Sequence, residues 1–257
     1  MTDTVETWAE AYVRAESLAY KLDPPPRPDR LSGARVLLDA PGRPPELTVA
    51  ARTPKTPRAG ALVDPARRAQ LLHTFFHHEL QAAELLCWAL LRFDDTPVAF
   101  RRGLMAICDD ELRHLRLYAA RLEALGHPVG SFPVRDWFWE RVPTCDTPLA
   151  FVSLLGIGFE GANLDHAARF ADALRAAGDE ASAALQEQVG REEIPHVRFA
   201  VTWFERWAGP LELERWCAAL PEPLTPILLR GKPLDREARR RAGQPDGFVD
   251  ALEAYRP

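Results

Sequence analysis

Four stretches of helix length, arranged in two closely linked pairs, constrain the fold of this sequence most. The expected helices cover about residues 65–92, 97–125, 148–177 and 180–208. Only residues 93–96 separate the first two, and only residues 178–179 separate the last two. Links this short make each pair an antiparallel hairpin, whereas residues 126–147 form a longer connection between the pairs. The sequence therefore predicts an all-α four-helix bundle of two antiparallel hairpins joined by one long crossover.

Capping residues mark the ends of these helices. Asp64, Thr96 and Thr147 each precede a proline, the pattern of an N-cap followed by proline at the first helical position. Gly178 is suited to end the third helix, and Asp179 to cap the fourth. We therefore expect the helices to begin and end near these residues.

Proline-rich chain precedes the predicted bundle, and short helices follow it. Residues 4–21 have the pattern of a short amphipathic helix, but residues 23–65 hold ten prolines and are expected to wrap the core as extended chain, with a short strand within residues 31–40. The tail is expected to pack around the bundle as short helices at 211–220, 235–242 and 246–254. The predicted domains are an N-terminal extension, the bundle and a C-terminal helical tail, at residues 1–63, 64–209 and 210–257.

Charge and hydropathy argue against two classes of partner. The 257 residues carry 32 basic and 37 acidic side chains, a net charge of -5, which disfavours a nucleic-acid-binding surface. No apolar run reaches the roughly 18 residues that a membrane span needs. The first ten residues are acidic and lack the apolar core of a signal peptide. The four cysteines are scattered without a Cys-x-x-Cys pair, so we expect a cytoplasmic protein with reduced thiols.

Each predicted helix places one glutamate on its apolar, core-facing side. On the second helix this side is formed by Phe100, Leu104, Ile107, Glu111, His114, Tyr118 and Leu125. The other helices place Glu79, Glu160 and Glu193 in the same way, and the fourth adds His196. The four glutamates lie 14, 14, 12 and 13 residues after the starts of their helices. Antiparallel hairpins should therefore bring all four carboxylates to one level of the core.

Four carboxylates buried in one layer require compensating positive charge. Burying even one unpaired ion is costly, and like charges add to that cost. Two divalent cations would balance the four charges. In each Glu-x-x-His sequence the two donors share one helical face, which suits joint binding of a metal ion. The sequence therefore predicts a site for two metal ions with the ligands Glu79, Glu111, His114, Glu160, Glu193 and His196.

These motifs resemble those of ferritin-like di-iron proteins. Each half of the chain has a glutamate followed 32 or 33 residues later by Glu-x-x-His, which looks like a duplicated helical hairpin. Residues 110–114, Asp-Glu-Leu-Arg-His, match the Asp-Glu-x-Arg-His form of ferritin-like di-iron oxygenases and oxidases. Residues 78–82, 192–196 and 235–239 resemble a bacterial ferritin-like family that is classed as a domain of unknown function. The resemblance covers about residues 40–250 and implies a ferritin-like bundle with a di-metal site.

Residues next to the predicted ligands have two interpretations each. Asp110 and Glu192 precede the ligand histidines by four residues and could orient their rings, and Arg113 could neutralise an outer carboxylate. The two acids, Asp110 and Glu192, are equally compatible with solvated surface charges. Tyr118, one turn beyond the histidine of its helix, is either a core tyrosine or a redox-active neighbour of the metals with a catalytic role.

The third and fourth helices also contain residues that are unfavourable in a helix interior. Gly156, Gly158 and Gly161 surround Glu160, which indicates close helix packing or space beside the metals. Pro195 stands where the family resemblance leads us to expect a small residue. Because proline lacks the backbone donor, it is expected to kink the fourth helix between its two ligands.

The predicted site favours oxygen chemistry. The expected cofactors are two iron ions, with manganese or a mixed pair as alternatives. The leading interpretation is a di-iron oxidase or oxygenase that uses dioxygen to oxidise a small organic substrate, served by an electron-donor protein or acting as a homodimer. The alternatives are a di-manganese catalase-like enzyme and a ferroxidase or other iron-handling protein. No nucleic acid or membrane is expected as a partner.

Overall fold

The protein is all-α, as predicted. The computed structural model describes residues 3–52 and 56–256, and within these ranges no β-strand occurs; one isolated parallel bridge joins Val49 to Val134. The strand expected within residues 31–40 is wrong, because the Val36 N–H donates to the carbonyl of Leu91 at a helix end, which offers no strand ladder. No helix in the described ranges is long and apolar enough to cross a bilayer.

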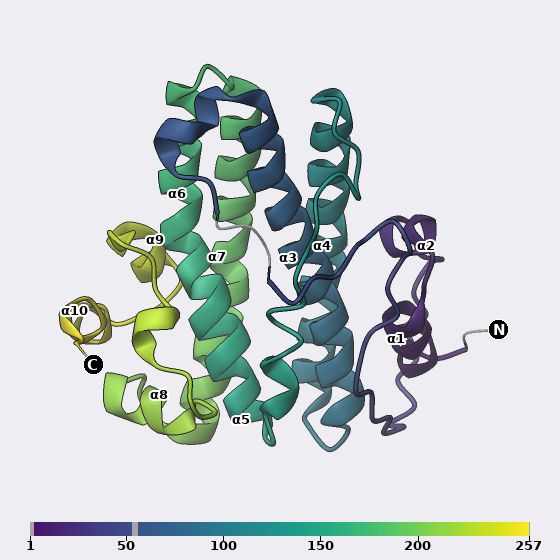
Figure 1. Ribbon diagram of the computed structural model, residues 1–257. Helices are drawn as coiled ribbons and strands as arrows, with labels where there is room; N and C mark the ends of the chain where they lie inside the picture. Colours follow the sequence, from purple (N-terminus) through teal and green to yellow (C-terminus); the bar gives the residue numbers. More distant parts are fainter. Residues whose placement is uncertain (1–2, 53–55, 257) are drawn as a thin grey trace. The chain divides into compact units, whose positions relative to one another are not determined.

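The chain forms two compact units, Met1–Pro143 and Thr144–Pro257. The division into an extension, a bundle and a tail is untested by this grouping and stays a prediction. In the first unit, the long hairpin helices α3 and α4 carry the shorter N-terminal helices α1 and α2 (Figure 1). The helices of this unit are α1 (Val5–Arg14), α2 (Leu18–Leu22), η1 (Ala59–Val63), α3 (Pro65–Arg92) and α4 (Val98–Ala124), and η2 (Val142–Thr144) lies at its end.

The second unit is built on another long hairpin. Its first arm is continuous from Pro148 to Ala176, and its second arm is α7 (Figure 1). The helices are α5 (Pro148–Phe151), η3 (Val152–Glu160), α6 (Gly161–Ala176), α7 (Glu180–Ala208), α8 (Leu213–Ala219), η4 (Pro226–Leu228), α9 (Arg236–Arg241) and α10 (Asp246–Ala254). Both hairpins and the three tail helices therefore lie close to their predicted ranges.

The predicted caps explain most of these helix ends. The side chains of Asp64, Thr147 and Asp179 each accept a backbone hydrogen bond from the first turn of the helix that follows. The prediction at Thr96 is wrong by one residue. Its hydroxyl donates to the carbonyl of Phe93, and Pro97 takes the N-cap position instead. Consequently no side chain caps the N-terminus of α4.

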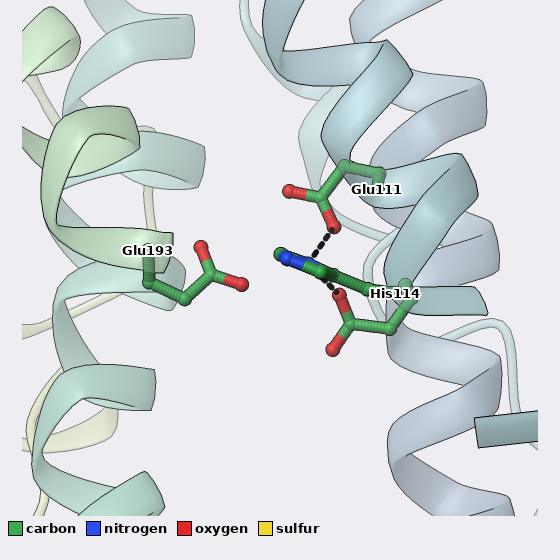
Figure 2. Close-up of side chains that lie close together, drawn as sticks. Glu111, His114 and Glu193 are labelled. Atoms are coloured by element: carbon green, nitrogen blue, oxygen red, sulfur yellow. Dashed lines mark hydrogen bonds and ion pairs between the residues drawn. The ribbon is translucent and has the colours of Figure 1, made fainter. Parts of the chain in front are cut away.

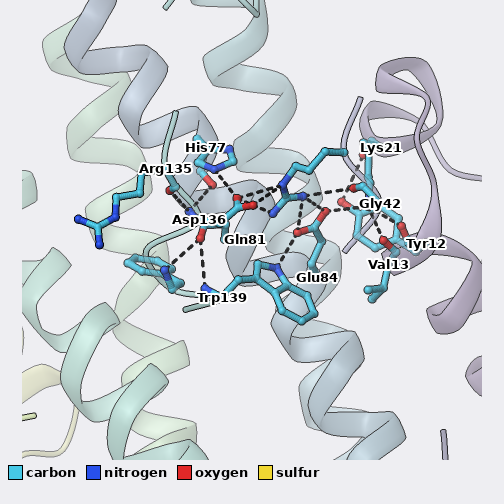
Figure 3. Close-up of polar contacts among 12 residues, drawn as sticks. Tyr12, Val13, Lys21, Gly42, His77, Gln81, Glu84, Arg135, Asp136 and Trp139 are labelled. Carbon is cyan, nitrogen blue, oxygen red and sulfur yellow. Dashed lines mark hydrogen bonds and ion pairs between the residues drawn. The ribbon is translucent and has the colours of Figure 1, made fainter. Parts of the chain in front are cut away.

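A polar stripe on α3 binds the loop that follows α4. The stripe consists of residues spaced by four, four and three positions: His73, His77, Gln81 and Glu84. In the same order they bond to Gly130, Asp136, Phe138 and Trp139, over 2.9, 3.0, 3.0 and 2.8 Å. Figure 3 shows His77, Gln81 and Glu84 with their contacts. Burial lowers the pKa of His73 to about 4, so its neutral ring accepts the Gly130 N–H. The stripe therefore fixes the crossover loop to one side of the helix.

Glu84 is the central charge of this stripe. Its fully buried carboxylate accepts from Lys21 Nζ at 2.7 Å and from Arg43 Nη1 at 2.7 and 2.9 Å (Figure 3). Burial alone would raise the pKa of Glu84, but the two cations outweigh it and lower the pKa below its usual value. Arg43 also pairs with Asp136 of the loop at 2.8 Å. This network joins α2, the proline-rich chain, α3 and the loop.

Asp165 has a similar role in the second unit. Its buried carboxylate on α6 accepts from the N–H groups of Gly231 and Asp235 and from both Nε and Nη2 of Arg239, over 2.6–2.9 Å. Trp216 Nε1 of α8 donates to the carbonyl of Ser153 at 2.9 Å. The tail is thus held to the first arm of its own hairpin by buried polar contacts.

We expect Glu84→Gln to lower the free energy of unfolding by about 3–5 kcal/mol, because it leaves the buried Lys21 and the partly buried Arg43 without their shared carboxylate. Adding Lys21→Met should recover part of the loss by removing one surplus cation. Urea unfolding followed by tryptophan fluorescence measures both effects. A loss below about 1 kcal/mol for the single variant would contradict the central role of Glu84.

Candidate metal centre

The first unit brings together three of the predicted ligands. Glu79 of α3 lies beside Glu111 and His114 of α4, and all three side chains are buried. His114 Nδ1 is 3.3 Å from Glu79 Oε2 and 3.7 Å from Glu111 Oε2, so the ring lies between two carboxylates of its own unit (Figure 2). We call Glu79, Glu111 and His114 the first cluster.

The first cluster holds a proton strongly. Burial alone would lower the pKa of His114, but hydrogen bonds and charge from Glu111 and Glu79 outweigh it and raise the pKa to about 11. In the metal-free protein the imidazolium therefore offsets negative charge between the two carboxylates.

The second unit repeats this composition. Glu160, at the end of η3, lies near Glu193 and His196 of α7, and each of the three is at most 7% exposed. His196 Nδ1 is 3.0 Å from Glu193 Oε2. Figure 2 labels Glu193, which belongs to the second unit. We call Glu160, Glu193 and His196 the second cluster.

Both clusters have a donor set that fits a metal ion. Within each, the three residues offer one ligand atom apiece, and these atoms lie within 4.8 Å of one another. Two carboxylates and one imidazole suit first-row transition metals such as iron and manganese. The structure thus gathers the six predicted ligands into two buried acid–histidine clusters, one in each unit, that could bind metal.

The second cluster adjoins an irregular segment that the sequence did not reveal. η3 is a π-helix from Val152 to Glu160, and the Gly161 N–H that follows it donates to the carbonyl of Gly156, five residues back. π-helical turns are rare and often occur at functional sites. Glu160 is therefore presented from a widened turn rather than from a regular α-helix.

Two glycines allow the arms of the second hairpin to approach closely. A Cβ on Gly156 would lie 2.3 Å from the Cβ of Ala200, and one on Gly190 would lie 2.5 Å from the Cβ of Ala167. Both distances are far below van der Waals contact. Of the two roles considered for Gly156 in the sequence, close packing is the one that its contacts support.

Pro195 does not interrupt α7, which is one helix from Glu180 to Ala208 with the proline inside. The helix bounds give no sign of the kink expected there. In this hairpin the irregular backbone lies on the opposite arm, in η3, where glycines permit it.

The other predicted site residues lie around the clusters. Tyr118 is fully buried, with its ring centroid 6.0 Å from that of Phe75. Arg113 Nη2 donates to Asp110 Oδ1 at 2.6 Å, in a pair that is about 40% exposed. Glu192 accepts from Gln188 Nε2 at 3.2 Å. The roles proposed for these residues beside the metals stay predictions.

Sequence reasoning favoured structural roles for His73 and His77 but missed Gln81 and Glu84 on the same side of α3. The 4-4-3 spacing of the stripe was a usable signal, because it marks a second buried face on a helix that already has one. Its partners Arg43 and Asp136 lie in irregular chain, where no periodicity identifies them.

The fold and the clusters define an all-α protein with two buried carboxylate–histidine clusters of metal-binding composition. The chain belongs to the family described as "Protein of unknown function (DUF455)", whose model matches residues 2–250. No curated protein and no solved structure matches the chain.

We expect Gly156→Ala to destabilise the protein by about 1–3 kcal/mol, since the new methyl group would overlap Ala200. Gly158→Ala is the matched control in the same segment, because its Cβ would meet the flexible end of Leu229 at 3.2 Å and the carbonyl oxygen of Ser153 at 3.3 Å, which is much milder than the 2.3 Å contact at Gly156. Thermal unfolding of both variants checks the difference. Equal melting temperatures would show that the hairpin arms can separate without cost.

Replacing Glu79 and Glu160 together by leucine should give a folded, metal-poor protein. Its melting temperature should equal or exceed that of the metal-free wild type, because buried acids without metal cost more than apolar side chains of similar volume. Glu84→Leu is the contrasting control, since Glu84 is buried but fully paired. A fall of several degrees in the Glu79/Glu160 variant would contradict this account of the clusters.

Proposed function

We propose that the two clusters join into one di-metal centre inside a ferritin-like four-helix bundle. The repeat of Glu and Glu-x-x-His in the two halves of the chain supports this, because it is the ligand pattern of carboxylate-bridged di-metal bundles. The matching composition of the clusters supports it further. Each cluster alone supplies three ligands, and shared glutamates would complete the coordination of both ions.

The function that this centre supports best is oxygen-dependent oxidation of a small organic substrate. Two iron ions, with manganese or a mixed pair as alternatives, would supply the redox chemistry when bound. The observation that carries the proposal is the pair of buried, equivalent clusters with one histidine and two glutamates each. Dioxygen and the substrate are the partners this function needs.

The protein's own residues have defined tasks in this proposal. The glutamates neutralise the cations, and the histidines fix the positions of the ions. Metal binding requires the proton held by His114 between Glu79 and Glu111 to leave. Leucine, phenylalanine and tryptophan side chains buried in both units keep water away from the reacting groups. Tyr118 is proposed as a hydrogen-bonding or redox neighbour.

Reconstituted protein should bind about two iron ions per chain. Glu111→Ala combined with His196→Ala should abolish loading, while Glu187→Gln, on a half-exposed residue of α7, should leave it unchanged. Elemental analysis measures the stoichiometry. His114→Ala alone tests the joining of the clusters: a shared centre loses affinity for both ions, whereas independent clusters would keep one ion per chain at wild-type affinity.

Oxygen consumption separates the enzyme from its alternatives. Ferrous-loaded protein should consume dioxygen and saturate near two irons per chain. Uptake of tens of irons per chain would instead indicate iron storage. Iron-loaded protein that is inert to dioxygen, together with a manganese form that releases oxygen from peroxide, would favour the catalase-like alternative.

A further inference from the structure

Two buried cysteines meet between the helices of the first hairpin. Cys87 of α3 and Cys108 of α4 are both inaccessible to solvent, and their Sγ atoms lie 3.7 Å apart. Cys108 Sγ donates to the carbonyl of Ala83 at 3.6 Å. Either thiol can donate its hydrogen to the other sulfur. The two thiols are therefore in direct contact.

This cysteine pair is one helical turn from the first cluster. Cys108 precedes Glu111 by three residues on α4, a rise of about 4.5 Å along the axis. Ala83, whose carbonyl Cys108 contacts, follows Glu79 by one turn on α3. All of these residues belong to the first unit. The thiols thus form the layer of the hairpin next to its metal-binding residues.

The surroundings protect the thiols from most oxidants. The hydrogen bond with Cys87 and burial raise the pKa of Cys108 well above its usual value. Its thiolate, the reactive form, is therefore scarce near neutral pH. Burial also excludes bulky disulfides such as oxidised glutathione. A small oxidant or an electron acceptor inside the protein can still reach the pair.

The geometry requires little movement to join the sulfurs. A disulfide has an S–S distance of about 2.05 Å, so the 3.7 Å separation must shorten by about 1.7 Å. Rotation of the two side chains together with a small helix shift can supply this. Cys145 and Cys217 are the other free cysteines; they lie in the second unit and are internal controls.

We propose that Cys87 and Cys108 form a dithiol–disulfide couple that releases two electrons inside the hairpin. With hydrogen peroxide as oxidant, one sulfur is oxidised to a sulfenic acid and one water leaves. The other sulfur then displaces the sulfenic oxygen, which leaves as a second water with the remaining thiol proton. Two thiols and one peroxide thus give one disulfide and two waters.

The two electrons can instead pass to bound iron, an inference that rests on the proposed function. Two ferric ions beside the couple would accept one electron each and become ferrous, while the two thiols lose two protons and form the disulfide. A monooxygenase needs two electrons in addition to those of its substrate, and this couple would deliver them from within the chain. An external reductant would then have to reduce only the disulfide.

Peroxide treatment of metal-free protein tests the couple itself. After alkylation of remaining thiols and digestion without reductant, mass spectrometry should find a peptide joined through Cys87 and Cys108 and two hydrogens lighter than its parts. Cys145 and Cys217 should be alkylated. Cys108→Ser should give no such peptide, and Cys145→Ser should behave like the wild type. Alkylation of all four cysteines in treated wild type would overturn the proposal.

Ferric-loaded protein kept without oxygen tests the electron transfer. Wild type and Cys145→Ser should release about two ferrous ions per disulfide formed, measured with a ferrous chelator and by peptide mapping, and Cys108→Ser should release none. Bound ferric iron that stays ferric would refute the couple as an electron source. If no iron binds, the proposed function fails, and the peroxide result alone decides whether the couple exists.

Discussion

Compensation of charge buried along α3 is the constraint on which the rest of the first unit depends. One side of the helix carries Glu79 toward the first cluster, and another carries Glu84 toward Lys21 and Arg43. The two glutamates are neutralised differently. Glu84 has its cations within the protein, so its contacts hold the N-terminal helices and the loop in place. Glu79 lies 3.3 Å from His114, whose pKa is raised to about 11, so here a proton rather than a fixed cation offsets the negative charge.

The second unit is held together by close packing of two helix backbones as well as by a buried charge. Gly156 and Gly190 let the two arms of the hairpin pack without side chains between them. The Asp165 carboxylate accepts hydrogen bonds from the tail, namely from the N–H groups of Gly231 and Asp235 and from the Arg239 guanidinium. It thereby satisfies donors that are buried when the tail packs. Glu160 lies between these two contacts along the chain. Its position therefore depends on the packing of Gly156 against Ala200 and on the bond of Asp165 to Arg239 of the tail.

Much of the fold and the composition of each cluster could be predicted, because both follow from local rules. Helix ranges come from caps and periodicity, and Glu-x-x-His spacing places both donors on one face. One error is local: the Thr96 hydroxyl bonds to Phe93, three residues back, and Pro97 takes the cap position. The other arose from a non-local contact, because Val36 bonds to the end of α3 instead of to a strand. Contacts such as Arg43 with Glu84 join distant irregular chain to a helix, and no single-sequence pattern encodes them.

The π-helical segment η3 makes the direction in which the side chains of α6 point depend on the number of residues in the segment. A turn with five-residue hydrogen bonds holds one residue more than an α-turn, and removing that residue would rotate everything downstream by about 100°. On α6, Ala167 would then turn away from Gly190 of α7, and Asp165 would turn away from Arg239 of the tail. Converting η3 into a regular α-helix by deleting a residue would therefore disrupt the contacts of α6 with α7 and with the tail at the same time.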